Sequence, residues 1–146
     1  MSATDAAALR LARALVARPD GWCKDSAIEW VGGGNADNPG ATRYWARGGA
    51  DLVRKVVAET PVELCRFSAL GAVLAARSRG PAKAALRRLC RAMPDGVCSS
   101  YPERGWFVRG DYGRVVAEWN AAEETTRDDV LAVFDRALER MGGRGS

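Results

Sequence analysis

The sequence predicts a mainly α-helical fold: a compact single domain of about five helices packed around one buried central helix. Apolar residues recur at helical spacing in several stretches, and turn residues such as Pro-Asp-Gly separate those stretches. The 146 residues are 47% hydrophobic and 27% charged. This composition suits a domain that buries a sizeable core without the help of disulfides or a structural metal. We expect residues 1–141 to form this domain and residues 142–146 to be a flexible tail.

The first third of the chain predicts one helix, followed by a segment for which two conformations are compatible with the sequence. Thr4 or Asp5 can cap a helix that runs to about residue 18, where Pro19-Asp20-Gly21 makes a turn. Residues 22–31 form either a short helix or an extended segment. The glycine-rich stretch that follows has no Gly-Lys-Ser/Thr ending, so it predicts a connection and not a phosphate-binding loop.

A second helix is predicted over about 50–58, and the clearest local signal follows it. In Thr60-Pro61-Val62-Glu63 the threonine can cap, the proline suits the first helical position and the glutamate completes a capping box. This pattern predicts a helix over 61–77, which is apolar nearly all round and therefore predicted to be the central helix. Four of its side chains are expected to be almost inaccessible to solvent: Leu64, Phe67, Leu70 and Leu74.

Two further helices are predicted in the second half. One covers about 82–93 and ends at a second Pro-Asp-Gly, and Thr125 or Thr126 caps the other, which runs to about 141. Between them, the aromatic and glycine pattern predicts a small β-hairpin near 105–117. The similarity of Leu11–Cys23 to Leu86–Cys98 suggests an internal pseudo-twofold repeat. Turn chemistry alone can also produce two Pro-Asp-Gly stops, so that alternative stays open.

The absence of histidine excludes several chemistries. The chain has no histidine, so Ser-His-Asp and Cys-His catalysis and histidine metal sites cannot occur. The four cysteines form no Cys-x-x-Cys pair, and we expect buried, reduced thiols in preference to a zinc site or disulfides. Acidic residues between 118 and 129 could serve an unfamiliar carboxylate-dependent enzyme, but they suit a helix N-terminus better. We therefore expect a non-enzymatic protein with no cofactor and no metal.

Three short motifs resemble an uncharacterised family of small actinobacterial and actinophage proteins. The motifs are Gly21-Trp22, the stretch Cys65–Leu74 with its Leu-Gly-Ala helix, and Val115–Asn120 followed by Thr126. Ala121 departs from the family, which has aspartate there, and Cys65 lies several residues before Leu-Gly-Ala. The resemblance implies a shared fold and assigns no activity.

Two surfaces are candidates for binding. The first is a set of arginines interleaved with aromatic residues in predicted loops, a composition enriched at binding sites. It predicts recognition of a protein partner or a small ligand through Arg43, Tyr44, Trp45, Arg47, Arg104, Trp106, Arg109 and Tyr112. The structural alternative is that these aromatic side chains fold back and cover the hydrophobic core.

The second surface is a basic ridge that predicts weak nucleic-acid binding as the alternative function. Its residues fall between 77 and 91, where the sequence has no acid, and they are Arg79, Lys83, Arg87 and Arg91. Either this ridge is functional, or it is a solvated face neutralised by the acidic segment 118–139. Apolar stretches are too short to span a membrane. We expect a cytoplasmic protein without a membrane partner, and a homodimer is compatible with the sequence.

Overall fold

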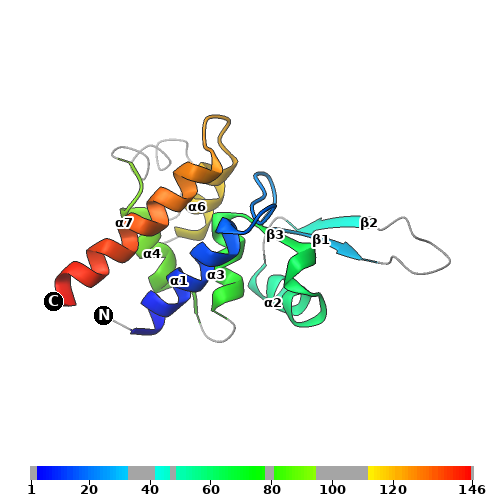
Figure 1. Ribbon diagram of the computed structural model, residues 1–146, viewed down its shortest axis with the longest axis horizontal. Helices are drawn as coiled ribbons and strands as arrows, with labels where there is room; N and C mark the ends of the chain where they lie inside the picture. The colour runs from blue at the N-terminus through cyan, green and yellow to red at the C-terminus, as the bar shows by residue number, and fades with distance from the viewer. Residues whose placement is uncertain (1–2, 33–41, 47–48, 78–80, 95–111, 146) are drawn as a thin grey trace.

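The computed structural model describes residues 3–32, 42–46, 49–77, 81–94 and 112–145, and it confirms the mainly α-helical class (Figure 1). Six α-helices lie in these ranges: α1 (Ala3–Ala17), α2 (Ala50–Glu59), α3 (Ala69–Ala76), α4 (Lys83–Arg91), α6 (Tyr112–Ala121) and α7 (Arg127–Gly145). The strands are β1 (Ile28–Gly32), β2 (Thr42–Ala46) and β3 (Cys65–Phe67), and a 3-10 turn, η1, spans Val62–Leu64. The proposed domain boundary at residue 141 stays a prediction.

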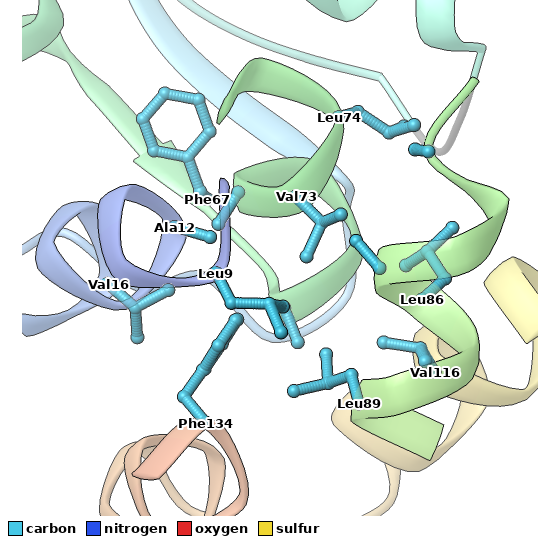
Figure 2. Close-up of a cluster of buried hydrophobic side chains, with 14 of the residues drawn as sticks. Leu9, Ala12, Val16, Phe67, Val73, Leu74, Leu86, Leu89, Val116 and Phe134 are labelled. Carbon is cyan, nitrogen blue, oxygen red and sulfur yellow. The ribbon is translucent and has the colours of Figure 1, made fainter. Parts of the chain in front are cut away.

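The helices form one body, from which the β1–β2 hairpin projects (Figure 1). Helix α1 packs on α3 and α7, and α4 packs on α6. Their apolar faces meet in a single core, shown in Figure 2, where Leu9 of α1, Leu89 of α4 and Phe134 of α7 are fully buried. None of the helices in the described ranges has both the length and the apolar composition needed to cross a membrane.

The helix predicted over 61–77 is shorter than expected and begins later. Pro61 precedes only the short turn η1, Cys65–Phe67 form β3, and helix α3 begins at Ala69. Strand pairing with β1 is the reason, since Cys65 and Phe67 lie opposite Trp30 and Ile28. Ser68, and not Thr60, caps the N-terminus of α3. Its side-chain hydroxyl accepts a hydrogen bond from the amide of Gly71.

The burial prediction for this segment is right in part. Phe67 is fully buried and Leu74 is buried, but Leu70 is only half-buried and Leu64 is exposed. Leu64 lies in η1 on the surface because the chain turns into β3 there. Helix α3 is nevertheless central, since it contacts α1, α2, α4 and α6.

The sheet has the order β2-β1-β3 with both pairings antiparallel. The extended alternative for residues 22–31 is therefore confirmed for β1. The predicted hairpin near 105–117 is wrong where it can be checked: residues 105–111 lie outside the described residues, and the rest form the start of helix α6. The strands of the described residues fall between 28 and 67. At the offsets of the proposed repeat, the counterparts of β1 and β2 fall within residues 95–111, outside the described ones, so the repeat stays a prediction.

Helix α7 confirms the predicted capping at Thr126. The Thr126 amide donates to the Asp129 carboxylate at 2.9 Å, and the Thr126 hydroxyl accepts from the Asp129 amide at 3.2 Å. Thr125 has a different role, because its buried hydroxyl donates to the carbonyl of Trp119 at 2.7 Å and so closes the end of α6. Asp5 lies within the first turn of α1.

The cysteines differ from the expectation in one respect. Cys23 and Cys65 are buried free thiols, as predicted, whereas Cys90 on α4 is disulfide-bonded, which contradicts the expected set of reduced thiols. Cys98 lies outside the described residues. The separation of Cys90 from the other cysteines along the chain could not indicate this bond, because a disulfide depends on spatial proximity.

Thiol mapping tests this pattern. Burial, and then the charge of Glu29, raises the pKa of the Cys23 thiol from 9.0 to about 12. At pH 8 the thiolate fraction of native Cys23 is then about one in ten thousand, against about one in ten for a thiol of pKa 9. We expect iodoacetamide to leave Cys23 unmodified in the native protein. In urea without reductant it should modify Cys23 and Cys65, and Cys90 only after reduction; peptide mass spectrometry reads this out.

The same thiol gives a pH dependence. The folded state holds the Cys23 proton more tightly than the unfolded state, so its contribution to the free energy of unfolding is lost as pH rises from 9.0 towards about 12. Modification of Cys90 in urea before any reductant is added would contradict the disulfide.

Candidate functional site

Helix α4 separates an apolar face from a basic one. Leu86 and Leu89 are buried and point into the core (Figure 2). Lys83, Arg87 and Arg91, at spacing i, i+4 and i+8, are exposed on the opposite side. At a rise of about 1.5 Å per residue, neighbouring cations of this ridge are about 6 Å apart along the helix axis.

The basic face of α4 forms one wall of a cavity of about 670 Å³. Helices α1, α6 and α7 supply its other walls through Asp5, Tyr112, Ala137 and Arg140. The α4 side contributes Pro81, Lys83, Ala84, Arg87, Arg88 and Arg91. Five cations, one aromatic ring and one carboxylate thus face a single space, hereafter the basic cavity.

The acidic C-terminal segment does not neutralise the basic cavity in the described part of the chain. Asp135 instead forms an ion pair with Arg13 of α1, and Glu118 pairs with Arg114 of its own helix. Asp129 is engaged at the N-terminus of α7. No carboxylate of a described residue lies within ion-pair distance of Lys83, Arg87, Arg88 or Arg91. The basic ridge is therefore positive and without a described internal counter-ion.

Two arginines of α7 fix the position of α4 beside the cavity. Arg136 donates to the carbonyl of Ala92 at 2.8 Å, and Arg140 donates to the carbonyl of Arg91 at 2.6 Å. These two carbonyls lie at the C-terminal end of α4, where the backbone offers no further amide within the helix to donate to them. The same bonds that cap α4 thus hold Arg140 next to Arg91, far apart in the sequence.

A second hollow of about 440 Å³ adjoins the basic cavity. It shares Pro81, Lys83 and Tyr112 with it and is otherwise largely apolar, with Leu70, Leu74 and Leu86 in its lining. Tyr112, half-buried at the start of α6, therefore lies where the basic and apolar surfaces meet. A cationic surface beside an aromatic ring suits a ligand that carries both phosphate and a flat ring.

The cavity also contains an acid that the charge pattern did not predict. Asp5 is only 8% exposed although it lies in the first turn of α1, and it lines the basic cavity. No described residue forms a hydrogen bond or an ion pair with the Asp5 carboxylate. No fully buried side-chain oxygen of the described residues lacks a partner, so the Asp5 carboxylate reaches the solvent of the cavity and is open to a ligand there.

The arginine–aromatic residues are divided by the structure. Tyr44 and Trp45 are 43% and 64% exposed on β2, where the Tyr44 ring stacks on Trp30 with centroids 5.6 Å apart. Arg43 belongs to β2 as well, and Tyr112 lies in the basic cavity. Four of the predicted residues lie outside the described ones: Arg47, Arg104, Trp106 and Arg109. A single arginine–aromatic surface stays a prediction.

The basic ridge is brought together more fully. Lys83, Arg87 and Arg91 all line the basic cavity, while Arg79 lies outside the described residues. Sequence reasoning missed Asp5 and Arg140 as members of this site, and it placed Arg88 in the basic run but not on the ridge. Only packing brings Asp5 and Arg140 to α4, so no local pattern in the sequence indicates them.

The described residues hold no group of three or more His, Cys, Asp or Glu side chains suited to a metal ion. A family model described as a family of unknown function matches residues 1–140 of the chain. No curated protein and no solved structure matches it. The chemistry of the site therefore rests on its own side chains: it can neutralise phosphates and stack a ring.

Proposed function

Since this chain belongs to the family of unknown function DUF6197, we propose its function from its own geometry: it binds single-stranded nucleic acid in the basic cavity. The observation that carries the proposal is the set of five cations facing one cavity against a single carboxylate, with none of the five within ion-pair distance of a described carboxylate. Phosphates would supply the missing negative charge. A concave site with an aromatic ring suits an open strand, whose bases can stack, more than the convex surface of a duplex.

The geometry of the ridge supports a polymer over a single anion. Lys83 and Arg91 are about 12 Å apart along α4, given the rise of an α-helix, so the ridge presents positive charge over a length greater than that of one phosphate. A strand that follows α4 would place successive phosphates beside successive cations, and its bases would reach Tyr112 and the adjoining apolar hollow.

The proposal includes a non-enzymatic role in the bacterial cytoplasm, for a protein encoded by a bacterium or by a phage. The resemblance of its motifs to small actinobacterial and actinophage proteins supports the source, and the lack of histidine supports the absence of catalysis. Disulfides are rare in reducing compartments, so the thiol mapping of Cys90 also bears on the cytoplasmic placement.

A second candidate function is recognition of a protein partner by β2. Strand β2 is at the edge of the sheet, and its Trp45 side chain is 64% exposed. An exposed edge strand can pair with a strand of another chain, including a second copy of this one.

Fluorescence anisotropy with a labelled single-stranded oligonucleotide at several salt concentrations tests the proposal. We expect the affinity to fall as salt rises, with a slope of about 0.7 in log–log form for each phosphate neutralised. The double variant Arg87→Gln/Arg91→Gln should bind more weakly and reduce that slope by about 1.4. Its thermal stability should stay near that of the wild type, since both side chains are exposed.

Two controls accompany this variant. Arg10→Gln removes one positive charge, against two in the double variant, from an exposed position outside the cavity lining. Trp45→Ala removes the exposed ring of β2. Both should keep wild-type affinity and slope. Unchanged binding by the double variant would refute the basic cavity as the site, and a loss confined to Trp45→Ala would place the oligonucleotide on β2 instead.

A further inference from the structure

We infer that Asp5 makes the basic cavity selective for guanine among the bases of a bound strand. The inference rests on the proposed function and concerns a different part of the ligand. Cations recognise phosphates, which are the same in every nucleotide, so the ridge alone gives affinity without sequence preference. Asp5 is the one acid among the residues that line the cavity in the described chain.

The environment of Asp5 indicates a ligand that donates hydrogen bonds. A carboxylate among the cations of an anion site repels phosphate and would weaken binding of a simple anion. Asp5 is also more than nine-tenths buried, with no hydrogen bond or ion pair from any described residue. A negative charge in the first turn stabilises a helix from an exposed position as well. That local role therefore does not require the burial of Asp5 in the cavity wall.

Only one common base matches a carboxylate on its pairing edge. A carboxylate accepts hydrogen bonds at two oxygens side by side and donates none. Guanine presents two adjacent donors there, the ring N1–H and the exocyclic N2–H, and can bind both oxygens as a guanidinium group does. Adenine and cytosine place an acceptor nitrogen next to their amino group. Uracil and thymine flank their single N–H with two carbonyl oxygens, which a carboxylate repels.

The cavity has the other contacts that this base would need. Tyr112 lines it from the start of α6 and can stack on a ring, while Arg87, Arg88 and Arg91 can hold the flanking phosphates. Asp5 and Tyr112 come from different helices, α1 and α6, so a base bound in the cavity would meet the carboxylate and the ring from separate walls.

Anisotropy titrations with three matched strands test the inference. Each strand is an oligothymidylate with guanine, inosine or adenine at every third position, in lithium buffer to disfavour four-stranded guanine structures. Wild-type protein should bind the guanine strand roughly tenfold more tightly than the adenine strand. Inosine, which lacks the exocyclic amino group, should fall between them.

Asp5→Asn should bring the three affinities to within about twofold of one another, because an amide offers one acceptor in place of two. Its affinity for the adenine strand should be equal or higher, since a repulsive charge has been removed. Asp51→Asn is the matched control: Asp51 lies in the first turn of α2, is exposed, and does not line the cavity. It should keep the guanine preference.

The outcomes separate the two proposals. Equal binding of the three strands by wild-type protein, or a guanine preference that survives in Asp5→Asn, overturns the inference and leaves the proposed function intact. Absence of salt-dependent binding to every strand removes both. If Asp5→Asn does not fold by circular dichroism, Asp5→Glu replaces it: it keeps the charge, shifts the carboxylate, and should reduce the preference.

Discussion

Asn120→Leu is expected to lower the free energy of unfolding by about 3–5 kcal/mol, because it leaves several buried polar groups without partners. Asn120 is fully buried on α6. Its side-chain oxygen accepts from the Trp22 indole at 2.8 Å and from the Ala69 amide at 3.0 Å. Its side-chain nitrogen donates to the carbonyls of Cys23 and Lys24 at 3.1 and 2.9 Å. One side chain thus joins α6 to the start of α3 and to the segment after α1.

Chemical denaturation monitored by circular dichroism measures this loss. Asn120→Asp is an informative second variant, since it keeps the oxygen that accepts from Trp22 and Ala69 but removes the donors to the two carbonyls. It should also be destabilised. Glu118→Gln, two residues away, breaks only a partly exposed ion pair with Arg114 and should cost less than about 1 kcal/mol. A loss of that small size for Asn120→Leu would show that the four hydrogen bonds contribute little.

Gly71→Ala is expected to destabilise the fold by about 3 kcal/mol or more, because backbone and not a flexible side chain occupies the space. A Cβ atom at Gly71 would overlap the carbonyl oxygen of Ala27 and lie 2.6 Å from its carbonyl carbon. That same oxygen accepts from the Ser68 amide at 3.1 Å, and the Ala27 amide donates to Ala46 of β2 at 2.8 Å. To admit one methyl group, α3 and the start of β1 must separate.

Gly142→Ala provides the matched control. Gly142 also lies in a helix, but a Cβ there meets nothing within 4 Å. The control should be neutral or stabilising by up to about 1 kcal/mol, since alanine favours a helix more than glycine does. Opposite signs for the same substitution are the expected result in thermal melts. Equal stability of Gly71→Ala and wild type would mean that the contact between α3 and Ala27 relaxes at little cost.

Asn120 and Gly71, together with Trp22, indicate what the short sequence motifs contribute to the fold. Trp22 and Asn120 come from separate motifs and are hydrogen-bonded to each other, and Asn120 also binds the N-terminus of α3, which carries Gly71. The motifs therefore meet at one joint in the fold. None of the three lines the basic cavity, so we interpret the motifs as structural, with the binding residues elsewhere.

The sequence by itself determined the helical class and most helix positions. Local signals suffice for α1, α2, α4 and α7, because apolar periodicity and turn or capping residues act within a few positions. The same local rules failed between residues 60 and 68, where the capping box precedes only a short turn. There, pairing of Cys65–Phe67 with β1 outweighed local helix propensity.

Only the tertiary structure decided which charges share a site. The spacing of Lys83, Arg87 and Arg91 on one helix face is a local property, and it was predicted. The partners of the acidic segment depend on which helices pack together: contact of α1 with α7 gives Asp135 to Arg13 and so leaves the ridge positive. The same packing brings Asp5 and Arg140, 135 positions apart in the sequence, to the cavity beside α4. Such proximity is set by the burial of apolar faces, and no local pattern of charges records it.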